Sequence, residues 1–248
     1  MAARAVSRAK AVSRWRAGRS QPRPGSEGFG ATPGALLAVC GLHGGAGTTT
    51  VTASLAVAAA GISPQEAVLA VEADARAGEL EDRLGVASPC SLEALAELAS
   101  AGRRPDAPFA TRVDGLRVIA SEPSAVDRRA VDIALVLAEA RRVHGLVVVD
   151  AGAICGDAAS ACLTSADIVL WTARAERLEL AAQRLSGPLV RDARGGRWLL
   201  AISGGRASRG ALSDVREVLA ARVTLPADLG QRPAAVEQLL DVVRSVVP

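Results

Sequence analysis

Short apolar runs alternate along the chain with longer segments in which apolar residues recur at a helical period. The runs predict strands at residues 36–41, 68–71, 116–120, 146–149, 168–172, 198–202 and 223–225. The segments between them predict helices that begin near Thr49, Ser91, Val126, Asp157, Arg177, Ser208 and Pro233. The strands are continuously apolar, which is typical of a parallel sheet with helices on both faces. We therefore expect an α/β fold, a three-layer sandwich around a mostly parallel sheet of about seven strands.

The first 34 residues differ from the rest in composition and charge. They contain one acid, Glu27, and seven basic residues, which are Arg4, Arg8, Lys10, Arg14, Arg16, Arg19 and Arg23. Their net charge is +6, and since the whole chain of 248 residues carries +3, residues 35–248 carry −3. Residues 20–34 are rich in Gly, Pro and Ser and predict a linker. We expect residues 1–34 to be a disordered basic tail with its linker, and residues 35–248 to form one domain.

The basic segment 1–23 allows two interpretations. It is either a solvated arginine-rich extension or a contact region for an anionic surface, nucleic acid or lipid headgroups. No apolar run reaches the roughly 18 residues of a transmembrane helix, and the N-terminus lacks the apolar stretch of a secretory signal. The four cysteines form no C-x-x-C pair, so neither a disulfide framework nor a zinc site is indicated. We expect a cytoplasmic protein, either free or peripheral to the inner face of the membrane or the nucleoid.

A glycine-rich segment, GGAGTTT at residues 44–50, lies between the first predicted strand and the first predicted helix. Its glycines permit positive φ angles and let main-chain N–H groups approach a ligand closely. Such N–H groups and the helix N-terminus form a cradle for phosphate. The candidate binding residues are Gly44, Gly45, Ala46, Gly47, Thr48, Thr49 and Thr50. The alternative is a tight strand–helix turn in which a threonine only caps the helix.

The same segment resembles the deviant Walker A motif of the MinD/ParA family of P-loop ATPases, K-G-G-x-G-K-[ST]-T. The glycines and the last two threonines match this motif. His43 stands where the family has its signature lysine, which reaches across a nucleotide-sandwich dimer, and Thr48 stands where it has the phosphate-loop lysine. The resemblance implies a P-loop fold of the MinD/ParA type that binds ATP and Mg²⁺, with Thr49 as a Mg²⁺ ligand.

Two later segments continue the resemblance in the family's order. Residues 67–80 resemble its second strand and the acidic turn after it, where Glu72 is the first acid and Asp74 would position the attacking water. Residues 145–152 resemble the Walker B strand. There Asp150 is the carboxylate expected to hold Mg²⁺ through water.

The lysine count changes what this resemblance implies. The chain has 28 arginines and one lysine, Lys10, so no lysine of residues 35–248 can replace the two that the motif lacks. A lysine on two phosphates supplies charge-assisted hydrogen bonds of about 1.5–3 kcal/mol each. We therefore expect weak or absent ATP hydrolysis and weakened ATP binding. Arg76 and Arg174 are candidates for restoring a positive charge; otherwise they are ordinary surface arginines.

Two further resemblances concern the nucleotide pocket and the biological role. Residues 223–240 resemble the region that flanks the family's adenine pocket, which places Pro226 beside the nucleotide. Residues 115–135 are most similar to the CpaE/TadZ branch, which is linked to pilus and secretion assembly.

Three functions stay open from the sequence. The first is a degenerate nucleotide-binding protein that acts as a positioning or scaffold factor in pilus or secretion assembly or in partitioning. The second is an active ParA-like ATPase that uses an arginine in place of the lysine and binds DNA through its tail. The third is a protein-interaction module that no longer binds nucleotide. Protein partners are expected in each case, and a homodimer would have to form without the signature lysine.

Overall fold

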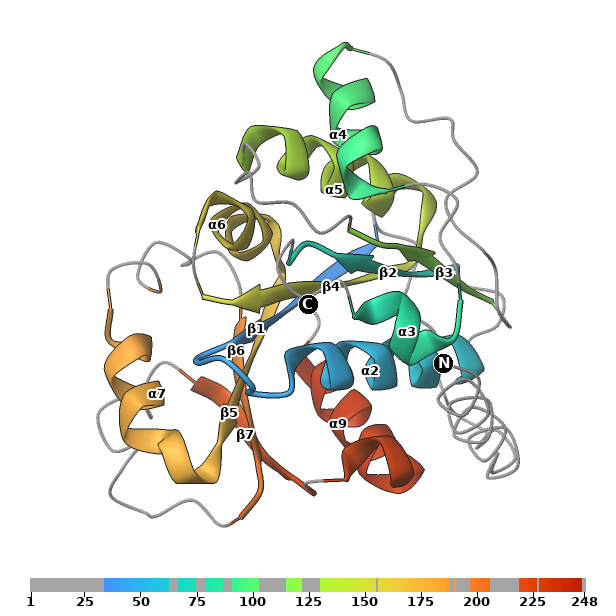
Figure 1. Cartoon of the computed structure of the whole chain (residues 1–248). Coiled ribbons are helices and arrows are strands. Elements are labelled where there is room, and N and C mark those ends of the chain that lie inside the picture. The colour runs from blue at the N-terminus through green and yellow to red at the C-terminus, as the bar shows by residue number, and fades with distance from the viewer. Residues whose placement is uncertain are drawn as a thin grey trace, which may run out of the picture.

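Seven parallel strands form one sheet at the centre of the molecule (Figure 1). The computed structural model describes residues 34–62, 67–74, 79–86, 91–102, 115–121, 130–154, 156–187, 190, 197–205, 219–226 and 228–246. The strands are β1 (Ala35–Gly41), β2 (Val68–Glu72), β3 (Leu116–Ile119), β4 (Leu146–Ala153), β5 (Ile168–Arg174), β6 (Arg197–Ser203) and β7 (Leu219–Leu225). Their order across the sheet is β3-β2-β4-β1-β5-β6-β7. The predicted α/β fold is confirmed, and each predicted strand is present.

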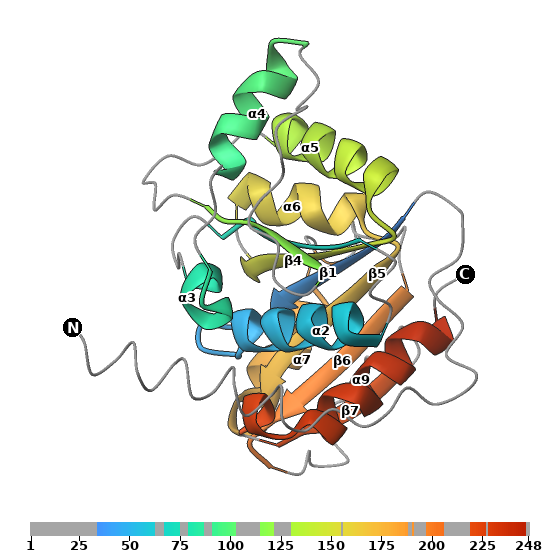
Figure 2. The ribbon, with the colours of Figure 1, turned by 90° about the vertical axis from the view of Figure 1, so that its right-hand side faces the viewer.

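Helices cover both faces of the sheet (Figure 2). One face carries α4 (Leu92–Ser100), α5 (Ala130–Val143), α6 (Gly156–Ser165) and α7 (Leu178–Leu185). The other face carries α2 (Thr48–Ile62), α3 (Leu80–Leu84) and α9 (Pro233–Val246). Two short 3-10 turns, η1 (Ala175–Arg177) and η3 (Leu229–Gln231), follow β5 and precede α9. Strands buried on both faces explain why their sequences are continuously apolar.

The predicted helices agree with the structure where it describes them. Helix α2 is rich in alanine, and ten of its 15 residues are buried because it packs against β4, α3 and α9. Helix α5 is described from Ala130, while the helix expected near Ser208 lies outside the described residues. Helix α3 was not predicted, because five residues are too few to show a helical period.

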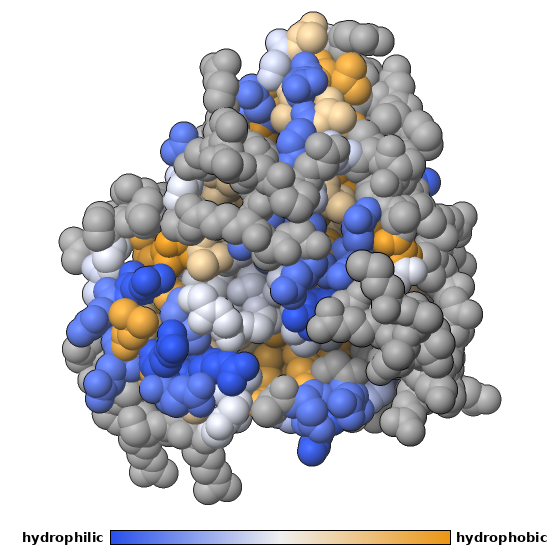
Figure 3. All heavy atoms as spheres, in the orientation of Figure 1, coloured by the Kyte–Doolittle hydropathy of each residue, from blue (hydrophilic) through white to orange (hydrophobic). Residues whose placement is uncertain are grey.

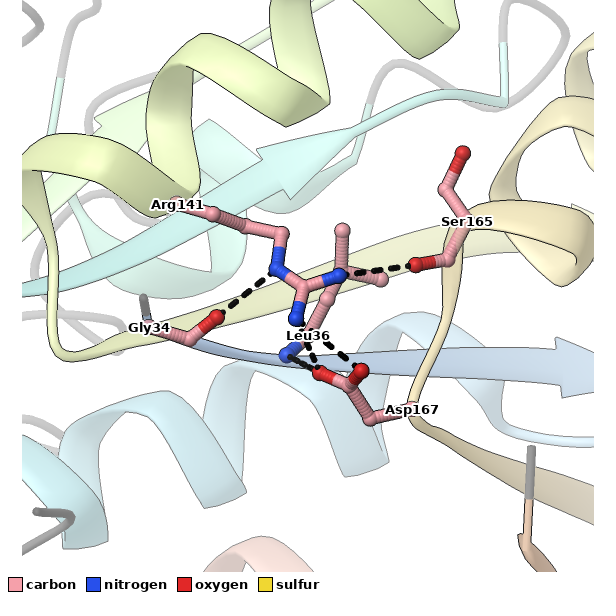
Figure 4. Close-up of polar contacts among 5 residues, drawn as sticks. All are labelled: Gly34, Leu36, Arg141, Ser165 and Asp167. Atoms are coloured by element: carbon pink, nitrogen blue, oxygen red, sulfur yellow. Dashed lines mark hydrogen bonds and ion pairs between the residues drawn. The ribbon is translucent and has the colours of Figure 1, made fainter. Parts of the chain in front are cut away.

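The amino edge of the sheet is fastened by one arginine of α5 (Figure 4). The Arg141 guanidinium donates to both carboxylate oxygens of Asp167, at 2.9 and 2.7 Å, and to the carbonyls of Gly34 (2.8 Å) and Ser165 (3.3 Å). The same carboxylate accepts from the Leu36 N–H at 2.8 Å. This network joins α5, the start of β1 and the turn before β5.

The core also contains two tryptophans and two of the four cysteines. Trp171 is fully buried and packs edge-on against Trp198, with ring centroids 5.8 Å apart. Cys40 and Cys162 are buried thiols of the core. No helix among the described residues is long and apolar enough to cross a membrane.

Candidate functional site

The loop between β1 and α2 turns at the carboxyl edge of the sheet, toward which the strands run in Figure 2. Gly45 and Gly47 have φ angles of 72° and 88°, in the left-handed region that favours glycine. A Cβ atom at Gly44, Gly45 or Gly47 would meet no heavy atom within 4 Å. The three glycines therefore border open space, and the turn does not need them for packing.

Six main-chain N–H groups at this turn have no acceptor within the described part of the chain. They belong to Gly44, Gly45, Gly47, Thr48, Thr49 and Thr50. Their neighbours are bonded: the Ala46 N–H donates to the His43 carbonyl (3.3 Å) and the Val51 N–H to the Gly47 carbonyl (2.9 Å). Free N–H groups at the start of a helix attract anions, since the helix dipole adds to their partial positive charge.

Thr48, at the position of the phosphate-loop lysine, commits its hydroxyl to the protein. Its Oγ1 is 3.1 Å from Oγ1 of Thr172 at the end of β5, and the Thr172 hydroxyl donates to the Cys40 carbonyl over 3.5 Å. The Thr48 hydroxyl is therefore tied to the end of β5, in a hydrogen bond in which either hydroxyl can be the donor. Gly41 makes room for this contact, because a Cβ atom there would lie 2.7 Å from the Thr48 hydroxyl.

Asp150 is a fully buried carboxylate of β4 with one oxygen left over. Its Oδ1 accepts from the Gly152 N–H at 2.9 Å, whereas Oδ2 has no hydrogen-bond partner among the described residues. Burial, together with the nearby carboxylates of Glu72 and Asp74, raises the pKa of Asp150 to about 7. The Thr49 hydroxyl and the Gly152 N–H favour the charged form and offset only part of this. The unpartnered oxygen marks a place where a cation would be stabilised.

The donor set suits Mg²⁺ that arrives together with phosphate. Within the described ranges no group of three or more His, Cys, Asp or Glu side chains could hold a metal by itself. Mg²⁺ keeps several waters and takes phosphate oxygens alongside one or two protein oxygens. Thr49, at the first turn of α2, and Asp150 would supply the hydroxyl and the carboxylate of such a site.

The two acids after β2 have different surroundings. Asp74 lies directly against Gly152 (φ 66°), where a Cβ atom would collide with its carboxylate. Glu72 pairs in register with Asp150 on the neighbouring strand β4. The structure therefore brings the predicted residues Asp74 and Asp150 to the same edge of the sheet.

The Glu72 carboxylate holds three main-chain N–H groups. It accepts from Glu79 (2.7 Å) and Leu80 (3.0 Å) at the start of α3, and from Ser121 (3.3 Å) after β3. Burial raises the pKa of Glu72 above its ordinary value, and these three bonds offset only part of that rise. Glu72 therefore positions the segments around the site.

His43 is buried and turned inward, and it holds the loop to β5. Its Nδ1 lies 3.0 Å from the Gly44 carbonyl, and its Nε2 accepts from the Arg174 N–H at 3.0 Å. The imidazole is therefore the neutral tautomer, with its proton on Nδ1 donated to Gly44. The Arg174 side chain adds a second bond, from Nε to the Gly45 carbonyl at 2.9 Å.

Pro226 follows the carboxyl end of β7, the last strand of the sheet and three positions from β1. It is half-buried, and η3 just beyond it packs against α2.

Figure 3, in the orientation in which the carboxyl ends of the strands face the viewer, shows blue and white residues across the described surface, with orange in small separate patches. Arg76, the other candidate cation, lies outside the described residues.

Comparison with solved structures places this arrangement in a known fold. A cell division ATPase MinD from Pyrococcus furiosus is 22% identical, with a TM-score of 0.66, and covers 86% of this chain and all of its own. Cobyrinic acid a,c-diamide synthase from Mycobacterium smegmatis, with bound ATP analog and magnesium, is 20% identical, with a TM-score of 0.66 and coverage of 85% and 94%. A ParA family ATPase from Chlorobium tepidum is 15% identical, with a TM-score of 0.64 and coverage of 86% and 93%. The chain therefore has the fold of the MinD/ParA P-loop ATPases.

Comparison by sequence adds nothing to this result: no family model matches the chain, and no curated protein does.

Two residues that shape the site were not identified from the sequence. Thr172 lies in an apolar strand and carries no motif, although a polar residue near the end of a buried strand was a possible signal. Gly152 lies two positions after Asp150 in the sequence. Its contact with Asp74 could not be predicted, because it depends on the pairing of β2 with β4.

Proposed function

We propose that this protein binds a Mg²⁺–nucleotide at the β1–α2 loop and acts as a positioning or scaffold factor, with weak or absent ATP hydrolysis. The observation that carries the proposal is that two features occur together among the described residues. They are the free N–H groups of the loop and the buried, unpartnered oxygen of Asp150. The first would hold phosphate and the second would face the cation bound to it. A tight structural turn needs neither feature.

The geometry of position 48 supports binding without efficient hydrolysis. Phosphoryl transfer depends on neutralising charge that spreads over the transferred group. Thr48 supplies no charge, and its hydroxyl is hydrogen-bonded to that of Thr172. Main-chain N–H groups still hold the ground-state phosphates. Asp74 would position the attacking water in any residual hydrolysis, and Pro226 would lie beside the base.

Calorimetric titration of the full chain with Mg-ADP and Mg-ATP tests this proposal. We expect dissociation constants in the micromolar to millimolar range, and hydrolysis near the uncatalysed background. Thr48→Lys restores the missing cation and should raise the affinity for Mg-ATP by about 10–100-fold. Absence of binding at millimolar nucleotide in both proteins would leave only the protein-interaction module.

The biological role that we infer follows the resemblance of residues 115–135 to the CpaE/TadZ branch. Solved structures of similar fold include a plasmid partition protein from Borrelia burgdorferi and the cell division ATPase MinD. A cytoplasmic factor that places a pilus, a secretion assembly or a replicon suits a nucleotide site with little turnover. Co-purification with tagged full-length chain, repeated with Asp150→Asn, would reveal partners whose binding depends on nucleotide.

A second function is favoured by the charge contrast between residues 1–34 (+6) and residues 35–248 (−3). We infer that residues 1–23 hold the protein to an anionic polymer, with DNA as the target. Binding to a random DNA duplex should then fall steeply between about 50 and 200 mM salt and depend on these residues. Equal DNA binding by a chain without residues 1–23 would exclude this function.

A further inference from the structure

The imidazole at position 43 has no free nitrogen for a second subunit. His43 is only 2% exposed, and its two ring nitrogens are bonded to the Gly44 carbonyl and the Arg174 N–H of the same chain. A side chain in this position cannot extend across an interface without breaking both bonds. Any cation that meets a phosphate on this loop must therefore come from another residue.

Arg174 is the arginine that hydrogen-bonds to this loop within the described part of the chain. Its N–H and its Nε hold His43 and Gly45 respectively. Its remaining guanidinium nitrogens are lightly engaged, since NH1 lies 3.7 Å from Glu176 and both side chains are more than half exposed. An ion pair of this kind contributes little and exchanges readily for a better anion.

We propose that His43 and Arg174 form an intrasubunit clamp that holds the phosphate loop and places the Arg174 guanidinium beside the phosphate bound there. The inference rests on the proposed function and deepens it. The cation of this site comes from its own chain, and the site needs no second subunit to become charged. The anion recognised is a diphosphate or longer phosphate chain.

The place of the charge explains what the clamp does. Arg174 lies on Gly45, at the exposed rim of the loop, whereas position 48 is buried against β5. A rim cation attracts a phosphate that settles on the free N–H groups of Gly44 and Gly47. It does not replace a charge at the buried end of the loop, so the clamp favours binding over turnover.

The test is calorimetric titration of inorganic pyrophosphate and Mg-ADP into the full chain and four variants. Arg174→Ala should weaken pyrophosphate binding by about 10-fold, which is below the full value of a charged hydrogen bond because the side chain is half exposed. Arg174→Lys keeps the charge but loses the planar fork, and should weaken binding by about threefold. His43→Ala should also weaken binding, because the loop loses its bond to the Arg174 main chain and with it the fixed position beside the guanidinium.

Arg177→Ala is the matched control, since it removes the same charge three positions further on, from an arginine with no hydrogen bond to the loop among the described residues. It should change pyrophosphate affinity by less than about twofold. Equal losses in Arg174→Ala and Arg177→Ala would mean a general field effect and would overturn the proposal. Unchanged binding in Arg174→Ala, with normal binding by the original chain, would overturn the clamp and leave the proposed function intact.

Amide hydrogen exchange of the ligand-free chain gives a second readout that needs no binding. The Arg174 N–H should be protected, and His43→Ala should abolish this protection because its acceptor is lost. Arg174→Ala should speed exchange at Ala46, whose N–H is bonded to the His43 carbonyl, and Arg177→Ala should not. Unchanged exchange in both His43→Ala and Arg174→Ala would refute the clamp. Failure of the original chain to bind either anion would refute the phosphate contact together with the proposed function.

Discussion

Two aspartates lie at opposite edges of the same parallel sheet, with opposite arrangements around their carboxylates. Asp167, at the amino edge, is held by two hydrogen bonds from Arg141 and by the Leu36 N–H (Figure 4). Asp150, at the carboxyl edge, is fully buried with one oxygen unpartnered among the described residues. The first is paired by the fold itself. The second is buried with an oxygen that the described part of the fold leaves without a partner.

The Asp167 network contributes to the stability of the fold, whereas the surroundings of Asp150 indicate a binding site. A buried carboxylate without a counter-charge lowers the stability of the folded chain, whereas charge-assisted hydrogen bonds from an arginine raise it. Evolution of a purely structural protein would favour an apolar residue or a partner at position 150. The presence of both the unpartnered Asp150 oxygen and the free N–H groups of the loop, within the described residues, is therefore the feature that a function must explain.

The largest expected effect comes from neutralising the unpaired carboxylate. Asp150→Asn, without Mg²⁺, should raise the free energy of unfolding at about pH 8 by up to about 4 kcal/mol, roughly three pKa units at 1.36 kcal/mol each. The pKa of Asp150 is about 7 in the folded chain against an ordinary value of 3.8, so the original chain loses stability as the pH rises through this window. Urea unfolding of both proteins from about pH 4 to pH 8 measures the difference.

At about pH 4 and below, the two proteins should approach equal stability, because Asp150 then becomes protonated in the folded and unfolded states alike. A variant less stable than the original chain at about pH 8 would contradict the description of Asp150 as a buried carboxylate with an unpartnered oxygen.

The paired carboxylate should respond with the opposite sign. Arg141→Ala leaves Asp167 with the Leu36 N–H but without its counter-charge and should lower the free energy of unfolding by about 2–3 kcal/mol, a value reduced because both side chains are about a quarter exposed. Asp167→Asn should also destabilise. Arg142→Ala, whose ion pair with Glu139 is 3.8 Å long, is the control and should cost less than about 0.5 kcal/mol. Nucleotide affinity should not change in any of the three.

A smaller effect is expected at Thr48, and it tests whether the Thr48 hydroxyl stabilises the fold or binds the phosphate. Thr48→Val and Thr172→Val each remove the hydroxyl pair and should cost about 1 kcal/mol of stability. Neither should change pyrophosphate affinity more than about twofold, because the Thr48 hydroxyl is already hydrogen-bonded to that of Thr172. A tenfold loss in Thr48→Val alone would move this hydroxyl into the binding site.

The smallest effect is expected at the amino edge, at His144. Its Nδ1 donates to the Ala140 carbonyl (2.9 Å), its Nε2 faces Arg117 (3.5 Å), and burial lowers the pKa of His144 below 6.5. As the pH falls below 6.5 the unfolded chain takes up a proton that the folded chain does not, so stability declines. His144→Gln removes this contribution, so the variant should gain stability relative to the original chain between about pH 7 and pH 5 in urea unfolding, on top of the opposite contribution of Asp150. An unchanged pH profile would show that other groups control it.

The sheet could be predicted because each strand is buried on both faces and its sequence is a continuous apolar run. The order of the strands and the network of Arg141 could not, since Arg141 and Asp167 are 26 residues apart and meet only when α5 and β5 dock. Helix α3 escaped prediction because its start depends on the carboxylate of Glu72, which comes from the preceding strand.

The chemistry of the site was only half readable from the sequence. The glycines, Thr49, Asp74 and Asp150 carry a recognisable spacing, and the fold brings their elements to one edge. The orientation of Thr48 and His43 was not readable, because it depends on Thr172 and Arg174 at the end of β5, which lie 124 and 131 residues further on. A sequence motif indicates which residues precede a helix. It does not indicate which of their side chains form hydrogen bonds with a strand that is distant in the sequence.

The most direct test of the central claim is a titration of the ¹⁵N-labelled chain with Mg-ADP, followed through the amide NMR signals. We predict saturable shifts at Gly44, Gly45, Gly47 and the first turn of α2, with loss of Mg²⁺ dependence in Asp150→Asn. Amide signals of the Arg141–Asp167 network should stay unchanged. Loop signals that do not move at millimolar Mg-ADP would contradict the claim that these free N–H groups and Asp150 form a nucleotide site.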